Sequence, residues 1–254
     1  MNDHIPLLVA HRGYPTRFPE NSLEGITAAL KAGACFVEFD IQLSADGVPV
    51  VIHDQNLLRT AGLDLSVLDT SFSDLKNICV GEATHFNNRY SNAKLPGLDD
   101  IVELFSDWPR AQAVVEIKRS SLRHFGREAI LRPVSNALQS LRNRSIVISF
   151  DYDVILEFKR LDLYQAGWII EDYTDQTLAK ADALKPDYLI VKEELIPAAT
   201  KLLWQGSWQW MVYTVDEPQH ALELARLGAS LVETNAIGEM LHHPQLAQKA
   251  CKHD

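Results

Sequence analysis

The stretch that decides the fold is residues 35–53, CFVEFDIQLSADGVPVVIH. It contains two runs rich in β-branched and apolar residues, Cys35–Leu43 and Val48–His53, with only Ser44-Ala45-Asp46-Gly47 between them. A parallel crossover needs a dozen or more residues, and Asp-Gly is a favoured pair in a tight hairpin turn. These two strands are therefore predicted to run antiparallel.

Similar runs recur along the chain and alternate with amphipathic stretches long enough for helices, a pattern typical of βα units around a parallel sheet. The nine strand candidates are Leu7–Ala10, Cys35–Leu43, Val48–His53, Ala113–Lys118, Ile146–Ser149, Gln165–Ile170, Tyr188–Val191, Gln209–Tyr213 and Leu231–Glu233. Without the returning strand Val48–His53, eight remain, the number that a (β/α)8 TIM barrel of about 250 residues requires. We therefore expect an α/β fold of this kind, with an extra hairpin strand after strand 2. An open, doubly wound sheet is the alternative, but no GxGxxG motif follows the first strand.

Composition limits the class of protein. The chain has 254 residues, 46% of them hydrophobic, which is enough for a substantial core. Its 24 Lys and Arg against 34 Asp and Glu give a net charge of −10, which disfavours nucleic acid and anionic membranes as partners. No stretch approaches the roughly 18 apolar residues of a membrane span, and Met1–Pro6 lacks a leader pattern. We expect a cytoplasmic protein without integral membrane association.

Two further features concern organisation. Residues 54–97 show no strong helix or strand period, and a loop that long is usually functional or a small inserted subdomain. We expect one domain over residues 1–254, with 54–97 as a short insertion within it. The three cysteines, Cys35, Cys79 and Cys251, are odd in number and widely spaced, so we expect them to be reduced, with no disulfide framework and no zinc site.

Three polar side chains, Glu38, Asp40 and Gln42, share one face of the second strand because strand side chains alternate. On a solvated edge strand this would be unremarkable. Inside a barrel, two carboxylates on one face would repel each other and lose hydration unless a cation neutralised them. A hard, oxygen-preferring ion such as Mg²⁺ or Ca²⁺ fits such a site.

The hairpin predicts where His53 lies. Pairing about the Asp46-Gly47 turn puts His53 across from Phe39 if the loop has three residues and across from Asp40 if it has two. Either register brings His53 beside the carboxylates, although a one-residue bulge could redirect its side chain.

More polar residues close other strands. His11 and Arg12 end the first strand, which in a barrel puts them at the C-terminal rim, where active sites of this architecture lie. Glu116 and Lys118 share one face within an apolar run, a costly arrangement unless each finds a charged partner. Glu116 could complete a metal site, and Lys118 could hold phosphate. Residues 19–22, PENS, read first as a helix start capped by Asn21 or Ser22.

Together these residues resemble the glycerophosphodiester phosphodiesterase family. The matching strings are His11-Arg12-Gly13, Pro19-Glu20-Asn21-Ser22, Glu38-Phe39-Asp40, Asp46-Gly47 with Val50-Val51-Ile52-His53-Asp54, and Glu116-Ile117-Lys118. The resemblance is strong for Leu7–Thr60, extends through Lys118 and is fainter beyond. No single tripeptide is specific, but the ordered set with its spacing is. Late in the chain the pattern departs, with Tyr213 in place of the family's usual Trp, and Asn235-Ala236 in place of Asp-Pro.

The resemblance implies a TIM barrel that hydrolyses glycerophosphodiesters to an alcohol and glycerol 3-phosphate. It implies catalytic roles for His11 and His53, metal binding by Glu38, Asp40 and Glu116, and phosphate contacts from Arg12 and Lys118. Tyr213 would retain an aromatic wall for the substrate. The cofactor would be one divalent ion, Mg²⁺ or Ca²⁺, with Mn²⁺ as a further option, and the partner a small-molecule glycerophosphodiester.

Several alternatives stay open at the level of sequence. The nucleophile is either water or the substrate's glycerol 2-hydroxyl, and either histidine could be the acid. The head group, the metal and the oligomeric state are undetermined. A lysophospholipase D that accepts an acyl chain would need an apolar channel, for which the candidate aromatics are Phe72, Phe86, Phe150, Trp168 and Tyr213. A catalytically inactive phosphodiester-binding module is the remaining rival, but no catalytic group is missing.

Overall fold

A computed structural model describes residues 4–197 and 202–251 of the chain. Met1–Asp3, the start of the segment considered as a leader, lies outside the described residues. The nine strands are β1 Leu7–Ala10, β2 Phe36–Leu43, β3 Pro49–Val51, β4 Gln112–Ile117, β5 Ser145–Ser149, β6 Gln165–Ile170, β7 Tyr188–Lys192, β8 Gln209–Tyr213 and β9 Ala229–Thr234. Each strand candidate from the sequence falls on one of them.

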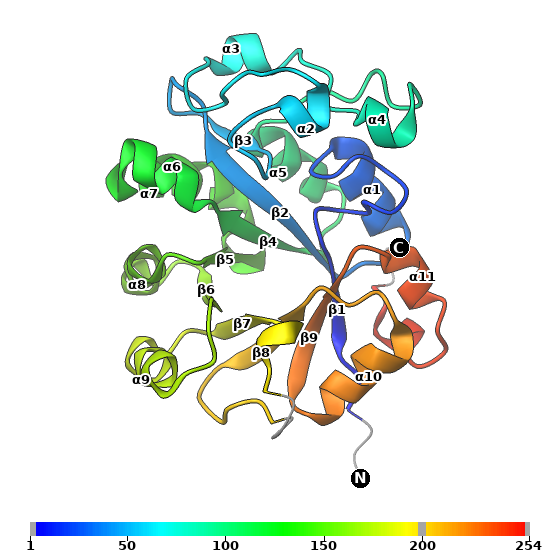
Figure 1. Cartoon of the computed structure of the whole chain (residues 1–254), viewed down its shortest axis with the longest axis vertical. Coiled ribbons are helices and arrows are strands. Elements are labelled where there is room, and N and C mark those ends of the chain that lie inside the picture. The colour runs from blue at the N-terminus through cyan, green and yellow to red at the C-terminus, as the bar shows by residue number, and fades with distance from the viewer. Residues whose placement is uncertain (1–3, 198–201, 252–254) are drawn as a thin grey trace.

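Eight of these strands form a closed parallel ring. The hydrogen-bonded order runs β1-β9-β8-β7-β6-β5-β4-β2, and the ring closes because β1 also pairs with β2. Figure 1 shows the ring with helices around its outside. The prediction of a (β/α)8 barrel is confirmed.

The ninth strand, β3, lies outside the ring and pairs antiparallel with β2, as the short connection predicted. Leu43 pairs with Pro49, and the backbone N–H of Ser44 donates to Val48 O at 3.0 Å, which leaves a three-residue loop at residues 45–47. Gly47 has φ +76°, a left-handed conformation that glycine adopts without strain. The three-residue alternative is therefore correct.

Helices follow the strands and cover the outer face of the ring (Figure 1). Their bounds are α1 Leu23–Lys31, α2 Leu58–Ala61, α3 Phe72–Leu75, α4 Ala83–Phe86, α5 Leu98–Ser106, α6 Arg119–Phe125, α7 Arg127–Ala137, α8 Tyr152–Leu161, α9 Asp175–Leu184, α10 Pro218–Arg226 and α11 Ile237–Leu241, with 3₁₀ helices η1 Leu138–Arg144, η2 Glu193–Leu195 and η3 Leu246–Lys249. Asp151 caps the first turn of α8 by accepting from the N–H of Val154 at 2.9 Å, and the buried face of this helix includes Phe158. Polar caps and one buried stripe are the sequence features that make such helices form and pack.

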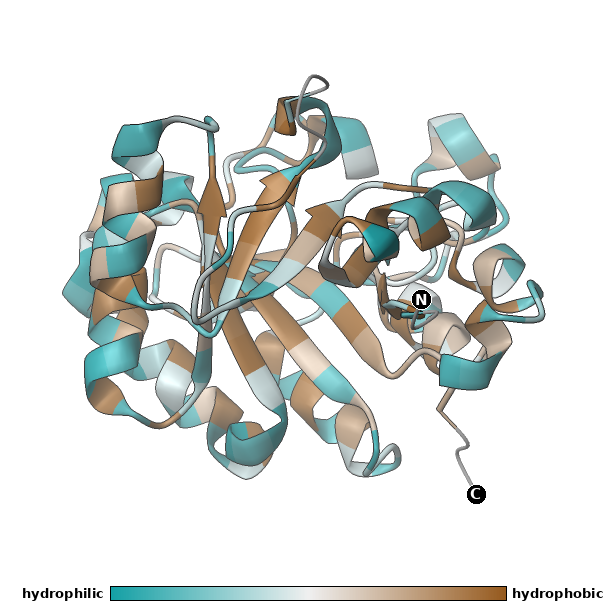
Figure 2. Ribbon diagram, turned by 90° about the horizontal axis from the view of Figure 1, so that it is seen from below, coloured by the Kyte–Doolittle hydropathy of each residue, from teal (hydrophilic) through white to brown (hydrophobic). Residues whose placement is uncertain are grey.

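Two apolar layers result from the alternation of strand side chains. One layer fills the barrel, with Val9, Val114 and Ile148 among its members. The other lies between the strands and the helices and includes Phe39 and Phe158. Figure 2 colours the ring strands mostly hydrophobic and the helices in mixed colours, as expected for strands buried on both faces. Polar residues in the ring strands are therefore exceptions that need an explanation.

Residues 54–97 contain the short helices α2, α3 and α4 and pack around a small apolar cluster of their own, which includes Leu57, Val67 and Leu75. Val51 N–H donates to Pro96 O at 2.9 Å, so the end of this segment covers the free edge of β3. An edge strand that is covered in this way is protected from pairing with other chains.

The expectation of reduced cysteines is wrong for two of the three. Cys35, just before β2, and Cys251 form a disulfide with a Cα–Cα distance of 5.0 Å across a sequence separation of 216. It ties the C-terminal segment to the N-terminal end of the barrel. Only Cys79 is free among the described residues. Within the described part of the chain, no helix is long and apolar enough to cross a membrane.

Candidate functional site

The acids predicted from the sequence meet at the carboxyl end of the barrel. Asp40 of β2 and Glu116 of β4 are paired neighbours in the sheet, and one oxygen each from Glu38, Asp40 and Glu116 all lie within 4.8 Å of one another. Glu38 is 2% and Asp40 1% exposed, and Glu38 Oε1 and Asp40 Oδ1 have no hydrogen-bond partner. Among the described residues this is the one group that could hold a metal ion.

Two cations stand against these acids. Lys118 Nζ lies 2.7 Å from Glu116 Oε1 and 3.2 Å from Asp40 Oδ1. Arg12 places Nε 3.1 Å from Asp40 Oδ2 and Nη1 3.2 Å from Glu20, while its backbone N–H donates to Glu38 Oε2 at 2.9 Å. Both residues predicted to contact phosphate therefore lie within the acid cluster.

The loop after β1 needs its glycine. Arg12 has φ +50° and Gly13 φ +89°. A Cβ on Gly13 would lie 2.7 Å from the backbone carbonyl carbon of Gly25 in α1, closer than atoms can pack. The chain therefore turns sharply enough for Arg12 to point back over the barrel mouth.

Burial and repulsion set the charges of the acids. Burial, with the neighbouring Asp40, raises the pKa of Glu38 well above its usual value, and the same causes raise the pKa of Glu116 to about 7. Burial would also raise the pKa of Asp40, but Lys118 and Arg12 outweigh it and hold that pKa below its usual range. Asp40 is thus the firmly ionised member, and the site as a whole has more negative charge than its cations offset.

Each predicted catalytic histidine has one ring nitrogen held. His11 Nδ1 lies 2.8 Å from Asn235 Oδ1, and His53 Nδ1 lies 2.6 Å from Asp54 Oδ1. Because both partners accept, Nδ1 carries the proton in this arrangement and Nε2 is left for other contacts. Burial, with the neighbouring Arg12, lowers the pKa of His11 to about 4.

His53 reaches the site by a route that simple alternation does not predict. Continuing the β2–β3 register beyond Val51 sets His53 opposite Phe39, whose side chain faces the helices. The strand ends at Val51, however, and His53 lines the same cleft as Glu116 and Lys118. The turn of the chain after β3, and not the pleat, therefore directs the imidazole to the site.

Sequence reasoning missed several supporting residues. Ser22 is the cap of α1, whereas Asn21 holds Asp40, donating from Nδ2 to Oδ2 at 2.9 Å and accepting the Asp40 N–H at 3.0 Å. Arg59 joins Glu20 at 2.7 Å to Asp54 at 2.7 Å and so links the two sides of the site. Asp54 was detectable as the direct neighbour of His53, but Arg59 lies within residues 54–97, which show no clear period, and carried no signal.

Tyr213 and Glu233 also face the barrel mouth. Tyr213 ends β8 and packs, partly buried, against the apolar layer inside the barrel. Glu233, near the end of β9, is 5% exposed. Leu231 faces the barrel interior, so period-two alternation, the signal that identified Glu38, would also have placed Glu233 inside.

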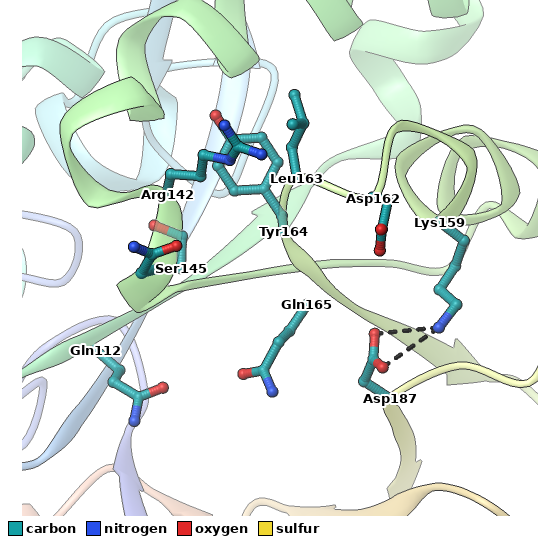
Figure 3. Close-up of a pocket in the computed structure, with 10 residues that line it drawn as sticks. Gln112, Arg142, Ser145, Lys159, Asp162, Leu163, Tyr164, Gln165 and Asp187 are labelled. Carbon is teal, nitrogen blue, oxygen red and sulfur yellow. Dashed lines mark hydrogen bonds and ion pairs between the residues drawn. The ribbon is translucent and has the colours of Figure 1, made fainter.

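A cleft of about 730 Å³ opens beside the acids. Its lining includes His53, Glu116 and Lys118, and continues over Arg119 to Phe150. A separate polar hollow of about 520 Å³ lies at the opposite end of the barrel, where Figure 3 shows the Lys159–Asp187 ion pair facing Gln165. This second hollow contains none of the predicted site residues.

A closed parallel barrel with acids, imidazoles and cations gathered at the carboxyl ends of its strands defines the class: the chain is a (β/α)8-barrel enzyme. Comparison with known proteins identifies the kind. The model of the glycerophosphoryl diester phosphodiesterase family matches residues 11–239. The chain therefore belongs to this family of phosphodiester hydrolases.

Individual relatives and one solved structure are consistent with this family. The chain is 26% identical over 237 residues to a glycerophosphodiester phosphodiesterase of Caldanaerobacter subterraneus, covering 90% of this chain and 93% of that protein. It is 32% identical over 155 residues to one of Bacillus altitudinis, covering 61% of this chain and 62% of that protein. A solved phosphodiesterase of Oleispira antarctica, in complex with the product sn-glycerol-3-phosphate, has the same fold, with TM-score 0.79 and 22% identity over 94% of this chain and 96% of that one.

Proposed function

We propose that this enzyme hydrolyses small glycerophosphodiesters to an alcohol and glycerol 3-phosphate, with one divalent ion held by Glu38, Asp40 and Glu116, and with His11 and His53 as the proton-transfer pair. The observation that carries the proposal is the convergence of these three carboxylates and two imidazoles at one end of the barrel. The product named in the Oleispira antarctica complex supports glycerol 3-phosphate as a product of this chain too.

The acids fit a divalent ion. Glu38 Oε1 is buried without a partner, and Asp40 Oδ1 accepts no hydrogen bond but lies 3.2 Å from Lys118 Nζ. All three side chains offer the hard oxygen ligands that Mg²⁺, Ca²⁺ and Mn²⁺ prefer. When bound, such an ion supplies Lewis-acid polarisation of a phosphoryl oxygen.

The chain's own residues supply the remaining chemistry. Arg12 and Lys118 lie where they can bind the non-bridging phosphoryl oxygens and offset the charge that builds on them in the transition state. One histidine Nε2 removes the proton of the attacking water or 2-hydroxyl, and the other protonates the departing alkoxide. Asn235 and Asp54 hold the two rings in the tautomer that leaves Nε2 available.

The two histidines differ in a way that matters for charge. The partner of His53 is a carboxylate, which stabilises an imidazolium formed during turnover, whereas His11 is held by a neutral amide. Asp54 in turn is fixed by Arg59 Nε at 2.7 Å. We propose that positive charge during turnover develops mainly on His53.

The cleft favours a polar substrate over one with an acyl chain. Of the aromatics considered for an apolar channel, only Phe150 lines the cleft, together with Arg59, Arg119 and Arg123. Trp168 is buried in the core at 7% exposed, and Phe72 packs against the insertion's own cluster. Tyr213 stays a proposed wall of the substrate site. A lysophospholipase D activity is therefore the less supported candidate.

A panel of substrates and metals tests the proposal. Glycerophosphocholine, glycerophosphoethanolamine, glycerophosphoglycerol and lysophosphatidylcholine are offered with Mg²⁺, Ca²⁺ or Mn²⁺ after chelation, and alcohol release and glycerol 3-phosphate are measured. We expect metal-dependent release of both products from the water-soluble diesters. Full activity after verified metal removal would contradict the metal role, and preference for the lysolipid would contradict the substrate class.

Two further proposals concern the whole chain. We propose that residues 1–254 act as one domain, with 54–97 as an insertion that supplies Arg59 to the site; deletion of the insertion should then abolish activity. The sequence led us to expect a cytoplasmic location, and we keep it as a proposal. The Cys35–Cys251 disulfide is evidence against it, because disulfides persist mainly in oxidising compartments. The redox state of these cysteines in freshly lysed cells tests it.

A further inference from the structure

Glu233 is a buried acid without a partner. It is 5% exposed, its Oε1 accepts no hydrogen bond, and in the described part of the chain no ion pair involves it. Buried carboxylates are almost always paired with a cation or bound to a metal, and an unsatisfied buried polar atom in a native structure calls for a missing water or ion. The described protein atoms therefore supply neither a hydrogen-bond donor to Glu233 Oε1 nor a cation that pairs with the Glu233 carboxylate.

Its electrostatic neighbours are the acids of the metal site. Burial, together with the like charges of Glu116 and Asp40, raises the pKa of Glu233 to about 8. Glu233 in turn contributes to the raised pKa of Glu38. The placement follows from the strand: Leu231, two residues earlier in β9, faces the barrel interior, so Glu233 also points inward, next to the carboxyl end of the strand. Its oxygens lie outside the set of the three proposed ligands that falls within 4.8 Å.

The acids at the barrel mouth outnumber the cations that face them. Around that mouth stand four carboxylates, Glu38, Asp40, Glu116 and Glu233, and two cations, Arg12 and Lys118. Both cations are already engaged, Arg12 with Asp40 and Glu20, and Lys118 with Glu116 and Asp40. With all four acids ionised, the excess is two negative charges, which one divalent ion offsets.

We propose that Glu233 is a fourth acid of the metal centre, acting on the hydration shell of the divalent ion from outside the three ligands and strengthening its binding. This proposal rests on the metal-dependent function given above and adds a residue on a strand, β9, that the ligand set does not include. Outer carboxylates of this kind accept hydrogen bonds from metal-bound water, and their loss commonly weakens metal binding by about 10–100-fold. Mg²⁺, which keeps several of its waters in proteins, should be affected most.

The test is the variant E233Q, which preserves size and removes the charge. Metal-free wild type and E233Q are titrated with MgCl₂ and with MnCl₂ by calorimetry, without substrate. We expect the dissociation constant for Mg²⁺ to rise about 10–100-fold in E233Q. A second readout is the rise in Tm that saturating metal produces, which should shrink in E233Q because stabilisation by a ligand follows its affinity.

Controls separate this outcome from misfolding and from failure of the proposed function. E193Q removes a carboxylate that pairs with His220 and does not line the cleft, so this variant should bind metal like wild type, whereas E38Q should lose binding. Metal-free E233Q should unfold at a temperature no lower than wild type, because removing an unpaired buried charge does not destabilise. Equal metal affinity of E233Q and wild type would overturn the role of Glu233 and leave the function intact; a wild type that binds no divalent ion would remove both.

Discussion

At the scale of single residues, the site depends on two imidazoles whose Nδ1 atoms are both held. H11A and H53A should each lower kcat by about 10²–10⁴-fold, the usual contribution of a general acid or base. Neither change removes a large buried apolar group, so the circular dichroism spectrum and Tm should stay close to wild type. Steady-state kinetics with a glycerophosphodiester gives the first quantity; a variant that retains more than half of wild-type kcat would show that its histidine is not in the proton-transfer pair.

Asp54 provides a finer test of the same residues. D54N keeps the size of the side chain but removes the charge that would stabilise an imidazolium on His53. We expect kcat to fall at least about tenfold with little change in KM, because the lost interaction strengthens only in the transition state. D64N, also within residues 54–97, is the matched control; among the described residues Asp64 accepts from Asn56 at 2.9 Å, and the substitution should leave kinetics unchanged. Equal effects of the two substitutions would count against the role of Asp54.

Much of the site could be predicted at this scale, and the exceptions have physical reasons. Glu38, Asp40 and Glu116 were identifiable because a charged residue on the inner face of a buried strand is costly and therefore unusual. Glu233 carries the same signal, but the strand candidate that contains it, Leu231–Glu233, is only three residues long, too short to show alternation. Asn235 approaches His11 across a sequence separation of 224, and no local pattern reports such a contact.

At the scale of elements, the hairpin around Asp46-Gly47 was predicted from the length of its loop alone. His53 was correctly predicted to lie at the site, but the argument from strand pairing was incomplete. The register sets His53 opposite Phe39, which faces the helices, and the imidazole reaches the cleft because β3 ends at Val51. The other edge of β3 is covered by residues 54–97, since Pro96 O accepts the N–H of Val51. A contact with a residue more than 40 positions later is not visible in the strand's own sequence.

The tie between the C-terminal segment and β2 makes a prediction about stability. Replacing Cys35 and Cys251 together by serine should lower the free energy of unfolding by about 2–5 kcal/mol, the usual cost of losing a disulfide that closes a long loop. Urea denaturation of the oxidised wild type, the reduced wild type and the double variant measures this, with Cys79→Ser as a control that leaves the disulfide in place. Reduced wild type should match the double variant; no difference between oxidised and reduced protein would show that the bond does not contribute.

At the scale of the whole molecule, the count of strands led to the barrel, because eight strands in βα order close into one stable ring. Other global features could not be read from the chain. The helices of the insertion are four residues long, too short to show a helical period. The disulfide joins Cys35 and Cys251 across almost the whole chain, and widely spaced cysteines alone do not predict pairing.

The excess of buried acids should make the stability of the metal-free protein depend on pH. The pKa values of Glu116 and Glu233 are raised from 4.5 to about 7 and about 8, so above pH 4.5 the folded state binds more protons than the unfolded state. Stability therefore falls as pH rises through these values. His11 acts in the opposite sense, since its pKa is lowered from 6.5 to about 4, but its effect fades as the pH rises above 6.5.

From pH 6.5 to about 8 the acids therefore dominate the pH dependence. In a chelator we expect Tm to decline across it by a few degrees, at about 2–4 °C per kcal/mol for a chain of this size. A divalent ion competes with the protons on the same carboxylates, so with saturating Mg²⁺ the decline should disappear and the Tm difference between the two conditions should widen with pH. Differential scanning fluorimetry at several pH values measures both curves. A metal-free Tm that is flat or rises over this window would mean that these acids are already neutralised within the protein, and the need for a divalent ion at the barrel mouth would lose its electrostatic basis.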